Sequence, residues 1–446
     1  MKNINLTEGS IFKNILFLSL PSMVTLLLQD AFNLVDMYFV GKLSASALAS
    51  VSMAGIIVGL LLVAVNGISA GTVALVSRHV GEGDIDKADK VVMQSFILGL
   101  IMTVIVTIIG CLFAPQMLEL LGASEEVVIQ GTSYLRITFG GSITIFLTVL
   151  MFSALRGAGD PLSPMRILVV STIANIILDP IMIYGLWGFP RLEVAGSALA
   201  TIVARAIGMV MVLRVMFQEK SIIKLRAQDF HFNWDIVKNI MKIGTPGALG
   251  ALVLNISALL LMGIVATFGT FAVAAYGVGM RLNMAVMIPT MGFGVASATL
   301  VGQNLGAGKS ERAEKSGWVC AGISASIMAI LSIVFLLLSG DLISIFNDEI
   351  EVVKIGTQFI RILAPSYIFI GSGMTLGRGL EGAGDTIHTM MFSTITMLVL
   401  RIPLAWYLPH WFGMKGIWSS LALTNAIYGI IVAIWFKMGR WKKRKI

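Results

Sequence analysis

Acidic residues are rare deep inside the long apolar stretches of this sequence, and three lie there: Asp30, Asp36 and Asp179. An aspartate at the centre of a bilayer costs about 2.5–3.5 kcal/mol on insertion scales, so such a residue faces a cavity or a partner. Two carboxylates that face each other in a dry site cannot both stay ionised unless a proton or a cation lies between them. This chemistry predicts a site for H⁺ or for Na⁺, because hard cations prefer oxygen ligands.

The segment "NIILDPIMIY" (175–184) places further oxygen atoms beside Asp179. Asn175 and Asp179 are four residues apart, so they share one helix face, and Ser171 extends that face by another turn. Pro180 donates no backbone N–H, which bends a helix and leaves a carbonyl oxygen free. Together these groups predict an oxygen-rich pocket along one side of the segment.

Two other segments are expected to line the same pocket. "AGSALAT" (195–201) ends in the hydroxyl of Thr201, and Asn33 lies three residues before Asp36. The predicted site for the driving cation is Asp36, Asn175, Asp179 and Thr201. Asn33 and Ser171 are candidates for a substrate cleft. The alternative is that each aspartate is a packing residue bonded to a neighbouring helix, and Asp30 is left without a role.

Arg205 and Arg401 also lie deep in apolar stretches. Each either pairs with an acid or shapes a cleft, and the sequence leaves these alternatives open. The four histidines lie at expected loops or helix ends without the spacing of a metal site. With no nucleophile–base pair and no metal set, we expect neither an enzyme nor a cofactor beyond a coupling ion.

The composition places these residues in a membrane protein. The chain has 446 residues, of which 57% are hydrophobic and 13% charged, against about 25% charged in soluble domains. Apolar runs of 18 or more residues recur along its whole length, too long and unbroken for the strands of a membrane barrel. We therefore predict an all-α polytopic protein with twelve transmembrane helices, at about 13–39, 46–76, 88–112, 127–151, 162–186, 194–217, 236–266, 271–301, 314–338, 351–376, 387–408 and 415–436.

Basic residues predict the orientation of these helices. Lys and Arg gather in the connections 77–87 and 217–235 and in the tail "KMGRWKKRKI" (437–446), whereas the connection 113–126 carries acids. Both termini are therefore expected in the cytoplasm and the protein in the inner (plasma) membrane. The net charge of +8 then reflects topology and indicates no nucleic-acid partner.

The sequence repeats itself at a distance of 225 residues. "IFKNILFLSLP" (11–21) returns as "IVKNIMKIGTP" (236–246), and "RGAGD" (156–160) returns as "EGAGD" (381–385). Six helices thus occur twice in the same orientation, which predicts two lobes around a central cleft, the architecture of a transporter. The expected parts are an N-lobe at 1–216, a cytoplasmic linker at 217–235 and a C-lobe at 236–446. Pro21 and Pro180 are expected to kink their helices.

Five motifs together resemble the multidrug and toxic compound extrusion (MATE) transporters. They are "PSMVTLLLQDAFNLVDMYFVGKLSASALA", "LRGAGD", "NIILDPIMIYG", "VAGSALAT" and "LVGQNLGAGK". The resemblance implies a two-lobed antiporter that exports cationic or amphipathic drugs in exchange for inward H⁺ or Na⁺. It places the family's cation site on Asp36, Asn175, Asp179 and Thr201, with a nearby tyrosine at Tyr134. Because the membrane interior of the C-lobe lacks carboxylates, the chain looks closest to the DinF-like branch.

A flippase for lipid-linked saccharides is the alternative function. Such a protein lines its cleft with basic groups for pyrophosphate, and Arg205, Arg281 and Arg401 are the residues available here. The acids of the predicted cation site would then be unexplained, so export of small organic molecules by a monomer in the lipid bilayer is the favoured function. The sequence leaves open the substrate, the oligomeric state and the choice between H⁺ and Na⁺.

Overall fold

A computed structural model describes residues 5–218 and 221–444, and every regular element in them is helical. The first half holds α1 (Ile11–Gly41), α2 (Ala45–Glu82), α3 (Ile85–Leu120), α4 (Glu125–Gly140), α5 (Ser142–Ala158), α6 (Leu162–Tyr184) and α7 (Glu193–Phe217). The second half holds α8 (Trp234–Ala266), α9 (Thr270–Gly306), α10 (Ser310–Leu337), α11 (Ser339–Ser344), α12 (Ile350–Leu363), α13 (Tyr367–Gly382), α14 (Thr386–Ser393), α15 (Arg401–Tyr407), α16 (Pro409–Phe412) and α17 (Met414–Met438). Short 3₁₀ or π segments are η1 (Leu186–Gly188), η2 (Ala227–Asp229), η3 (Ala364–Ser366), η4 (Thr394–Leu400) and η5 (Arg440–Lys443).

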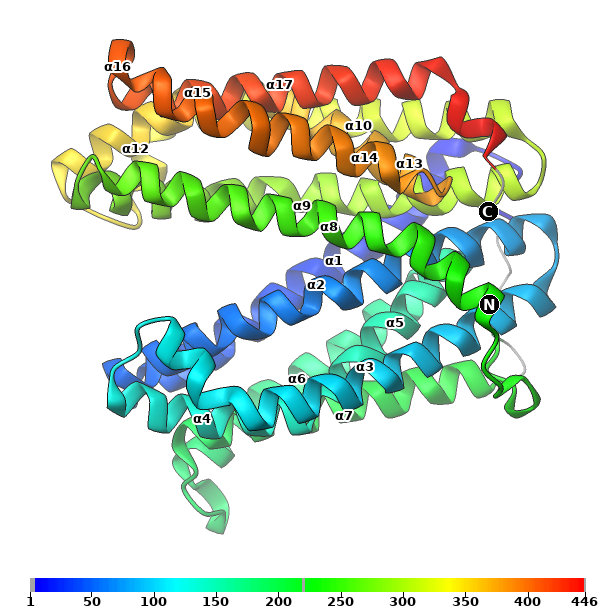
Figure 1. Cartoon of the computed structure of the whole chain (residues 1–446), viewed down its shortest axis with the longest axis horizontal. Helices are drawn as coiled ribbons and strands as arrows, with labels where there is room; N and C mark the ends of the chain where they lie inside the picture. The colour runs from blue at the N-terminus through cyan, green and yellow to red at the C-terminus, as the bar shows by residue number, and fades with distance from the viewer. Residues whose placement is uncertain (1–4, 219–220, 445–446) are drawn as a thin grey trace. The chain divides into compact units, whose positions relative to one another are not determined.

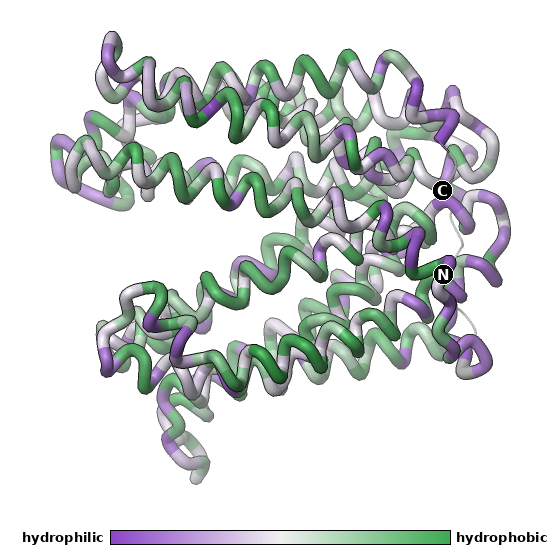
Figure 2. The backbone as a smooth tube through the Cα atoms, viewed as in Figure 1, coloured by the Kyte–Doolittle hydropathy of each residue, from purple (hydrophilic) through white to green (hydrophobic). Residues whose placement is uncertain are grey.

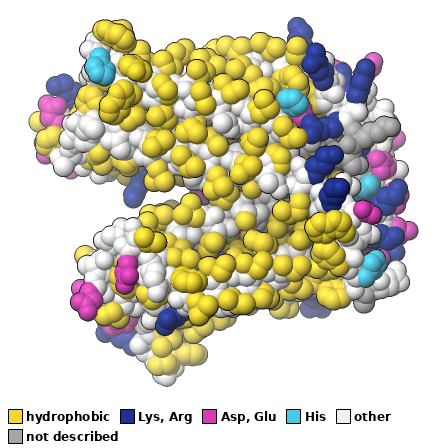
Figure 3. Space-filling model, viewed as in Figure 1, with side chains coloured by type: hydrophobic (Ala, Val, Ile, Leu, Met, Phe, Trp, Pro, Cys, Tyr) yellow, Lys and Arg dark blue, Asp and Glu magenta, His cyan; other side chains and the backbone are white. Residues whose placement is uncertain are grey.

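The helices are long and apolar enough to cross a bilayer. Eleven of the described helical stretches meet this test, and the pair α4–α5, bent by 50° at Gly141, brings the number to twelve. The predicted twelve-helix membrane fold is therefore confirmed. Figure 2 shows apolar residues along the helices and hydrophilic residues in the turns at their ends. On the face seen in Figure 3, hydrophobic side chains cover the helices, and Lys and Arg gather at the right-hand end.

The chain forms two compact units. One contains Val24–Val80 and Asp84–Thr245, and the other contains Asn5–Met23, Gly81–Gly83 and Pro246–Ile446. The division falls inside α1 and α8, next to the repeat-matched residues Pro21 and Pro246. The lobe boundaries predicted from the repeat remain a prediction.

In the first unit, helices α3 to α7 pack on one another, and α6 runs along α7 (Figure 1). The connection after α7 is fixed to α3 by two buried polar side chains. Asp89, which is 1% exposed, accepts the backbone N–H of Lys224 at 2.7 Å and pairs with Arg226 at 3.0 Å. Gln94 donates to the carbonyl of His231 at 2.7 Å and accepts the N–H of Asn233 at 2.9 Å.

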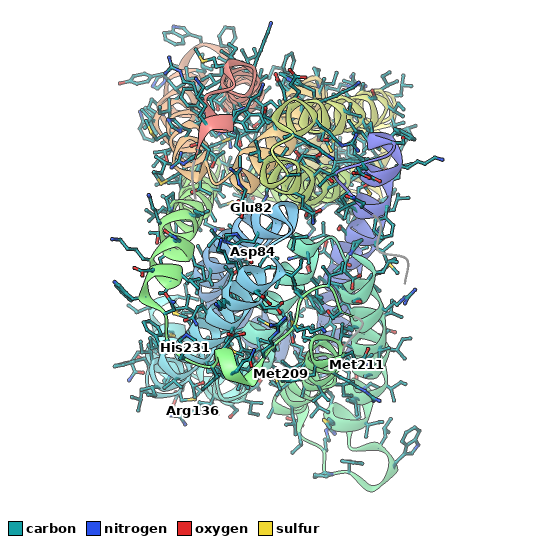
Figure 4. All side chains as sticks on the ribbon, turned by 90° about the vertical axis from the view of Figure 1, so that its right-hand side faces the viewer. Glu82, Asp84, Arg136, Met209, Met211 and His231 are labelled. Atoms are coloured by element: carbon teal, nitrogen blue, oxygen red, sulfur yellow. The ribbon has the colours of Figure 1, made fainter. Side chains whose placement is uncertain are left out.

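These contacts put the linker at the end of the unit where α2 meets α3. Figure 4 looks at this end and labels Asp84, in the turn between α2 and α3, and His231 in the linker. The linker is therefore bonded along the first unit before α8 begins.

The second unit includes residues 5–23, which contain the first turns of α1. Leu6, Ile15 and Leu18 are buried with Phe293 and Cys320, which lie on α9 and α10. The start of the chain is also held by hydrogen bonds, because Arg312 donates to the carbonyl of Glu8 at 2.7 Å and to that of Gly9 at 3.0 Å. The first turns of α1 thus belong to the core built by the second repeat.

Aromatic rings and close helix packing make up the rest of that core. Tyr276, Phe359 and Trp418 form a cluster in which ring centroids lie 4.9 to 6.0 Å apart. Helices α13 and α17 approach so closely that a Cβ on Gly429 would lie 2.2 Å from the carbonyl oxygen of Phe369. Small residues at such crossings let membrane helices pack backbone to backbone.

The repeated motif ending in aspartate has two structural roles. Asp160 accepts the backbone N–H groups of Leu162 and Ser163 at 3.1 and 3.0 Å, which caps the start of α6. Its counterpart Asp385 instead accepts the indole N–H of Trp435 at 3.0 Å and pairs with Arg444. The second copy therefore anchors the basic tail.

Candidate cation site in the first unit

Four polar side chains from α1, α6 and α7 meet inside the first unit. The amide nitrogen of Asn175 donates to Asp36 Oδ1 at 3.1 Å and to Asp179 Oδ1 at 3.2 Å. The hydroxyl of Thr201 donates to Asp36 Oδ2 at 2.9 Å. The structure thus brings together all four residues of the predicted cation site.

The cluster is shielded from solvent. Asn175 and Asp179 are 0% exposed, and Asp36 and Thr201 are each 5% exposed. Two of its oxygen atoms, Asn175 Oδ1 and Asp179 Oδ2, are buried without a hydrogen-bond partner among the described residues. A buried acceptor without a donor is costly, and a proton on the carboxylate or a bound cation supplies the missing partner.

Helix periodicity positions the α6 part of the site. Ser171, Asn175 and Asp179 follow one another at four-residue intervals and are all buried, whereas Ile173 and Ile177 on the opposite side are 52% and 50% exposed. The helix continues through Pro180 to Tyr184. Pro180 cannot donate to the carbonyl of Ile176, so this turn lacks one backbone hydrogen bond.

Tyr134 and Arg205 lie near the cluster. Tyr134 on α4 is 8% exposed and lies within electrostatic range of Asp36, Asp179 and Arg205. The guanidinium of Arg205, on α7, lies 5.3 Å from the centre of the Phe32 ring on α1 and within electrostatic range of Asp36. The cluster therefore contains two acidic side chains, Asp36 and Asp179. One basic neighbour, Arg205, interacts electrostatically with Asp36.

The other candidates lie apart from these hydrogen bonds. Ser171 is buried against α7, where a Cβ on Gly208 would lie 2.5 Å from its hydroxyl. Asn33 and Asp30 are exposed on α1. The sequence did not indicate one further contact between α6 and α1. The hydroxyl of Tyr184 donates a hydrogen bond to the carbonyl of Phe39 at 2.7 Å. Its only signal is a tyrosine at the end of the motif that contains Asp179.

Comparison with known proteins decides the family. The MatE family model matches residues 21–181 and 246–407, once in each repeat. The chain belongs to the MatE family. This membership confirms the resemblance to MATE transporters and makes the protein a membrane transporter and not an enzyme.

Related proteins align with nearly the whole length of this MatE protein. The "Probable multidrug resistance protein NorM" of Thermotoga maritima is 26% identical over 97% of this chain and 94% of its own length. The "FAD transporter" of Shewanella oneidensis is 26% identical over 95% and 94%. A crystal structure of MATE in a bent conformation is 25% identical, covers 98% and 97%, and superposes with a TM-score of 0.92. The relatives support a multi-pass exporter of small molecules.

Proposed function

We propose that this MatE protein is a secondary antiporter that exports cationic or amphipathic compounds in exchange for inward H⁺ or Na⁺. The observation that carries the proposal is the buried cluster of Asp36, Asn175, Asp179 and Thr201 with its two unpaired oxygen atoms. An entering cation supplies the missing charge, and it bonds α1 to α6 through the two carboxylates. Binding at this cluster thereby changes how α1 is held.

The cluster also accounts for the substrate class. Two acids with one neighbouring arginine leave a negative site that favours positively charged molecules, and Tyr134 adds an aromatic ring with which organic cations interact favourably. The flippase alternative leaves these acids without a role. Inward movement of one charge across 100 mV supplies about 2.3 kcal/mol, enough for roughly fifty-fold accumulation outside of a substrate without net charge. Export of a monovalent organic cation for one entering ion moves no net charge, so the concentration gradient of the ion drives it.

Efflux from proteoliposomes tests this function. Vesicles that contain the purified protein and rhodamine 123, an organic cation, are given a pH gradient or a sodium gradient, each in the absence of the other. We expect efflux at least about tenfold above that of protein-free vesicles under one gradient, since a tenfold gradient of the coupling ion supplies about 1.4 kcal/mol. Equal efflux with both gradients absent would show facilitated diffusion and contradict antiport.

Our proposed orientation has both termini in the cytoplasm of a cell with the protein in its plasma membrane. It rests on the positive-inside rule and on the gathering of Lys and Arg at one end of the helices (Figure 3). Loop 217–235 and the turn after α2 then lie inside, and the turn between α3 and α4 lies outside.

Cysteine labelling checks the orientation. In a background without Cys111 and Cys320, we expect a membrane-impermeant maleimide added to intact cells to label Ser124→Cys and to leave Ser221→Cys unlabelled. Ser124 makes no side-chain cap bond, so its replacement preserves α4. Labelling of Ser221→Cys from outside, with no labelling of Ser124→Cys, would reverse the topology.

A further inference from the structure

The second unit contains a partly buried arginine whose hydrogen-bond partners are all neutral. Arg401 begins α15 and reaches α17, which lies beside it (Figure 1). Its Nε donates to the hydroxyl of Thr424 at 2.9 Å, and its Nη2 donates to the amide oxygen of Asn425 at 2.7 Å. The same Nη2 lies 2.6 Å from the sulfur of Met397.

No acid is available to neutralise this guanidinium from its own segment or from α17. Residues 386 to 438 contain neither Asp nor Glu, and α9, which carries the neighbouring Tyr276, contains none either. Arg401 comes 15 residues after the start of α14 at Thr386, or about 22 Å along a helix, which places it near the middle of its span. An unpaired arginine at that depth is costly and marks a substrate or ion path by default.

The backbone around Arg401 departs from a regular helix. Thr394–Leu400, immediately before it, is a π-helix, and Pro403 two residues later cannot donate a hydrogen bond to the carbonyl of Val399. Such π segments inside membrane helices recur at functional sites. The helix is therefore irregular on both sides of Arg401.

The hydrogen bonds fix the guanidinium but leave part of it free. Asn425 donates its own amide N–H to the hydroxyl of Ser366 at 3.3 Å, which turns its oxygen toward Arg401. The Nη1 group of Arg401 has no hydrogen-bond partner among the described residues, and the side chain is partly exposed. An oriented guanidinium with free N–H groups is suited to the oxygen atoms of a carboxylate or phosphate.

We propose that Arg401, held by Asn425 and Thr424, is an anion-recognition site that takes the carboxylate or phosphate group of an exported amphipathic molecule. The inference rests on the proposed export function and adds a preference, among its substrates, for molecules that carry such a group. The repeat supports a division of roles, because Asn175 and Asp179 correspond to Leu400 and Leu404 at the 225-residue spacing. The first unit is acidic at its polar centre, and the second unit is basic.

Two dyes that differ only at one carboxyl group test the site. Rhodamine 110 carries a free carboxylate, and rhodamine 123 is its methyl ester. Binding to the purified full-length protein in neutral detergent is followed by fluorescence anisotropy. We expect the wild type to bind rhodamine 110 at least about tenfold more tightly, the size of one hydrogen bond to a charged group.

Variants connect the preference to Arg401. Arg401→Gln and Asn425→Asp should each remove the preference for rhodamine 110 and leave rhodamine 123 binding within about twofold. Asn425→Asp keeps the side-chain shape and supplies a carboxylate to Arg401, so it tests the site without removing the arginine. Arg361→Gln is the matched control, because Arg361 bonds Ser339 elsewhere in the second unit and should retain the preference.

Three outcomes would overturn the inference. The first is equal binding of the two dyes by the wild type. The second is a preference for rhodamine 110 that persists in both Arg401→Gln and Asn425→Asp. The third is a preference that disappears when phosphatidylglycerol is added to the micelles, which would assign the site to a lipid headgroup. None of these affects gradient-driven efflux of rhodamine 123 by the wild type. The proposed function is contradicted separately, by absence of that efflux.

Discussion

Replacement of Asp179 by asparagine is expected to abolish gradient-driven efflux. Asparagine has the same shape, and its oxygen can still accept from Asn175, which lies 3.2 Å from Asp179 Oδ1, so the fold should be kept. The cation loses one of its two negative ligands, and removal of one partner from a buried ion pair costs about 3–5 kcal/mol. We expect coupled efflux to fall about 100-fold or more, measured in proteoliposomes under the effective gradient.

Asp36→Asn should have the same effect, and the double variant should be no worse than either single variant. Residues that act as one unit show such non-additivity. Asp30→Asn is the matched control, since Asp30 lies on the same helix but is exposed, and it should keep efflux within about twofold. Normal efflux by Asp179→Asn under either gradient would contradict the proposed cation site. The segment 175–184 would then have only a structural role, as a helix that contains Pro180.

Gly429→Leu is expected to prevent accumulation of folded protein. The new Cβ would lie 2.2 Å from the carbonyl oxygen of Phe369, a contact with backbone that no rotamer change relieves, so α13 and α17 must separate. Overpacking of this kind costs about 1–3 kcal/mol even where side chains can adjust. We expect at least a tenfold loss of monodisperse protein in detergent chromatography, together with a lower melting temperature.

Gly322→Leu is the control for this prediction. Gly322 lies on α10 in the same unit, and a Cβ there has no atom within 4 Å, so the larger side chain should be accommodated at the surface. A folded and active Gly429→Leu variant would show that α13 and α17 do not depend on backbone contact.

The helices were predictable because each must bury about 20 apolar residues in the bilayer. The predicted span 194–217 differs from α7 by one residue at its start. The stretch 127–151 was expected as one helix, but it breaks by 50° at Gly141, where a Cβ would lie 2.5 Å from Ile202 on α7. The bend thus coincides with a close tertiary contact, and local sequence does not record which neighbour approaches a glycine.

Some contacts of the polar residues could likewise be predicted from the sequence, and others could not. The bond between Asn175 and Asp179 follows from a four-residue spacing, which the helix alone fixes. Ser171 shares that spacing but lies against Gly208, because the neighbouring helix changes along the face. Arg401 donates to Thr424 and Asn425, which lie on the separate helix α17. No spacing in the sequence indicated these two acceptors.

The position of the first residues in the second unit has a consequence for the order of biosynthesis. Leu18 packs in a cluster with Phe293, which follows it by 275 residues. At a synthesis rate of about 5–20 residues per second, roughly 14 to 55 s separate the appearance of these two side chains. The start of α1 therefore enters the bilayer long before its packing partners have been translated.

During that interval, the first turns of α1 lie in the lipid without their partners on α9 and α10, although the rest of α1 can already bond to α6 and α7 through Asp36. Helix insertion and helix packing are then separate events for this segment, and the ribosome finishes most of the chain between them. A polar substitution at Leu18 is thus a defect that appears late, in full-length and inserted chains, and the cell would detect it by membrane quality control and not by failed targeting.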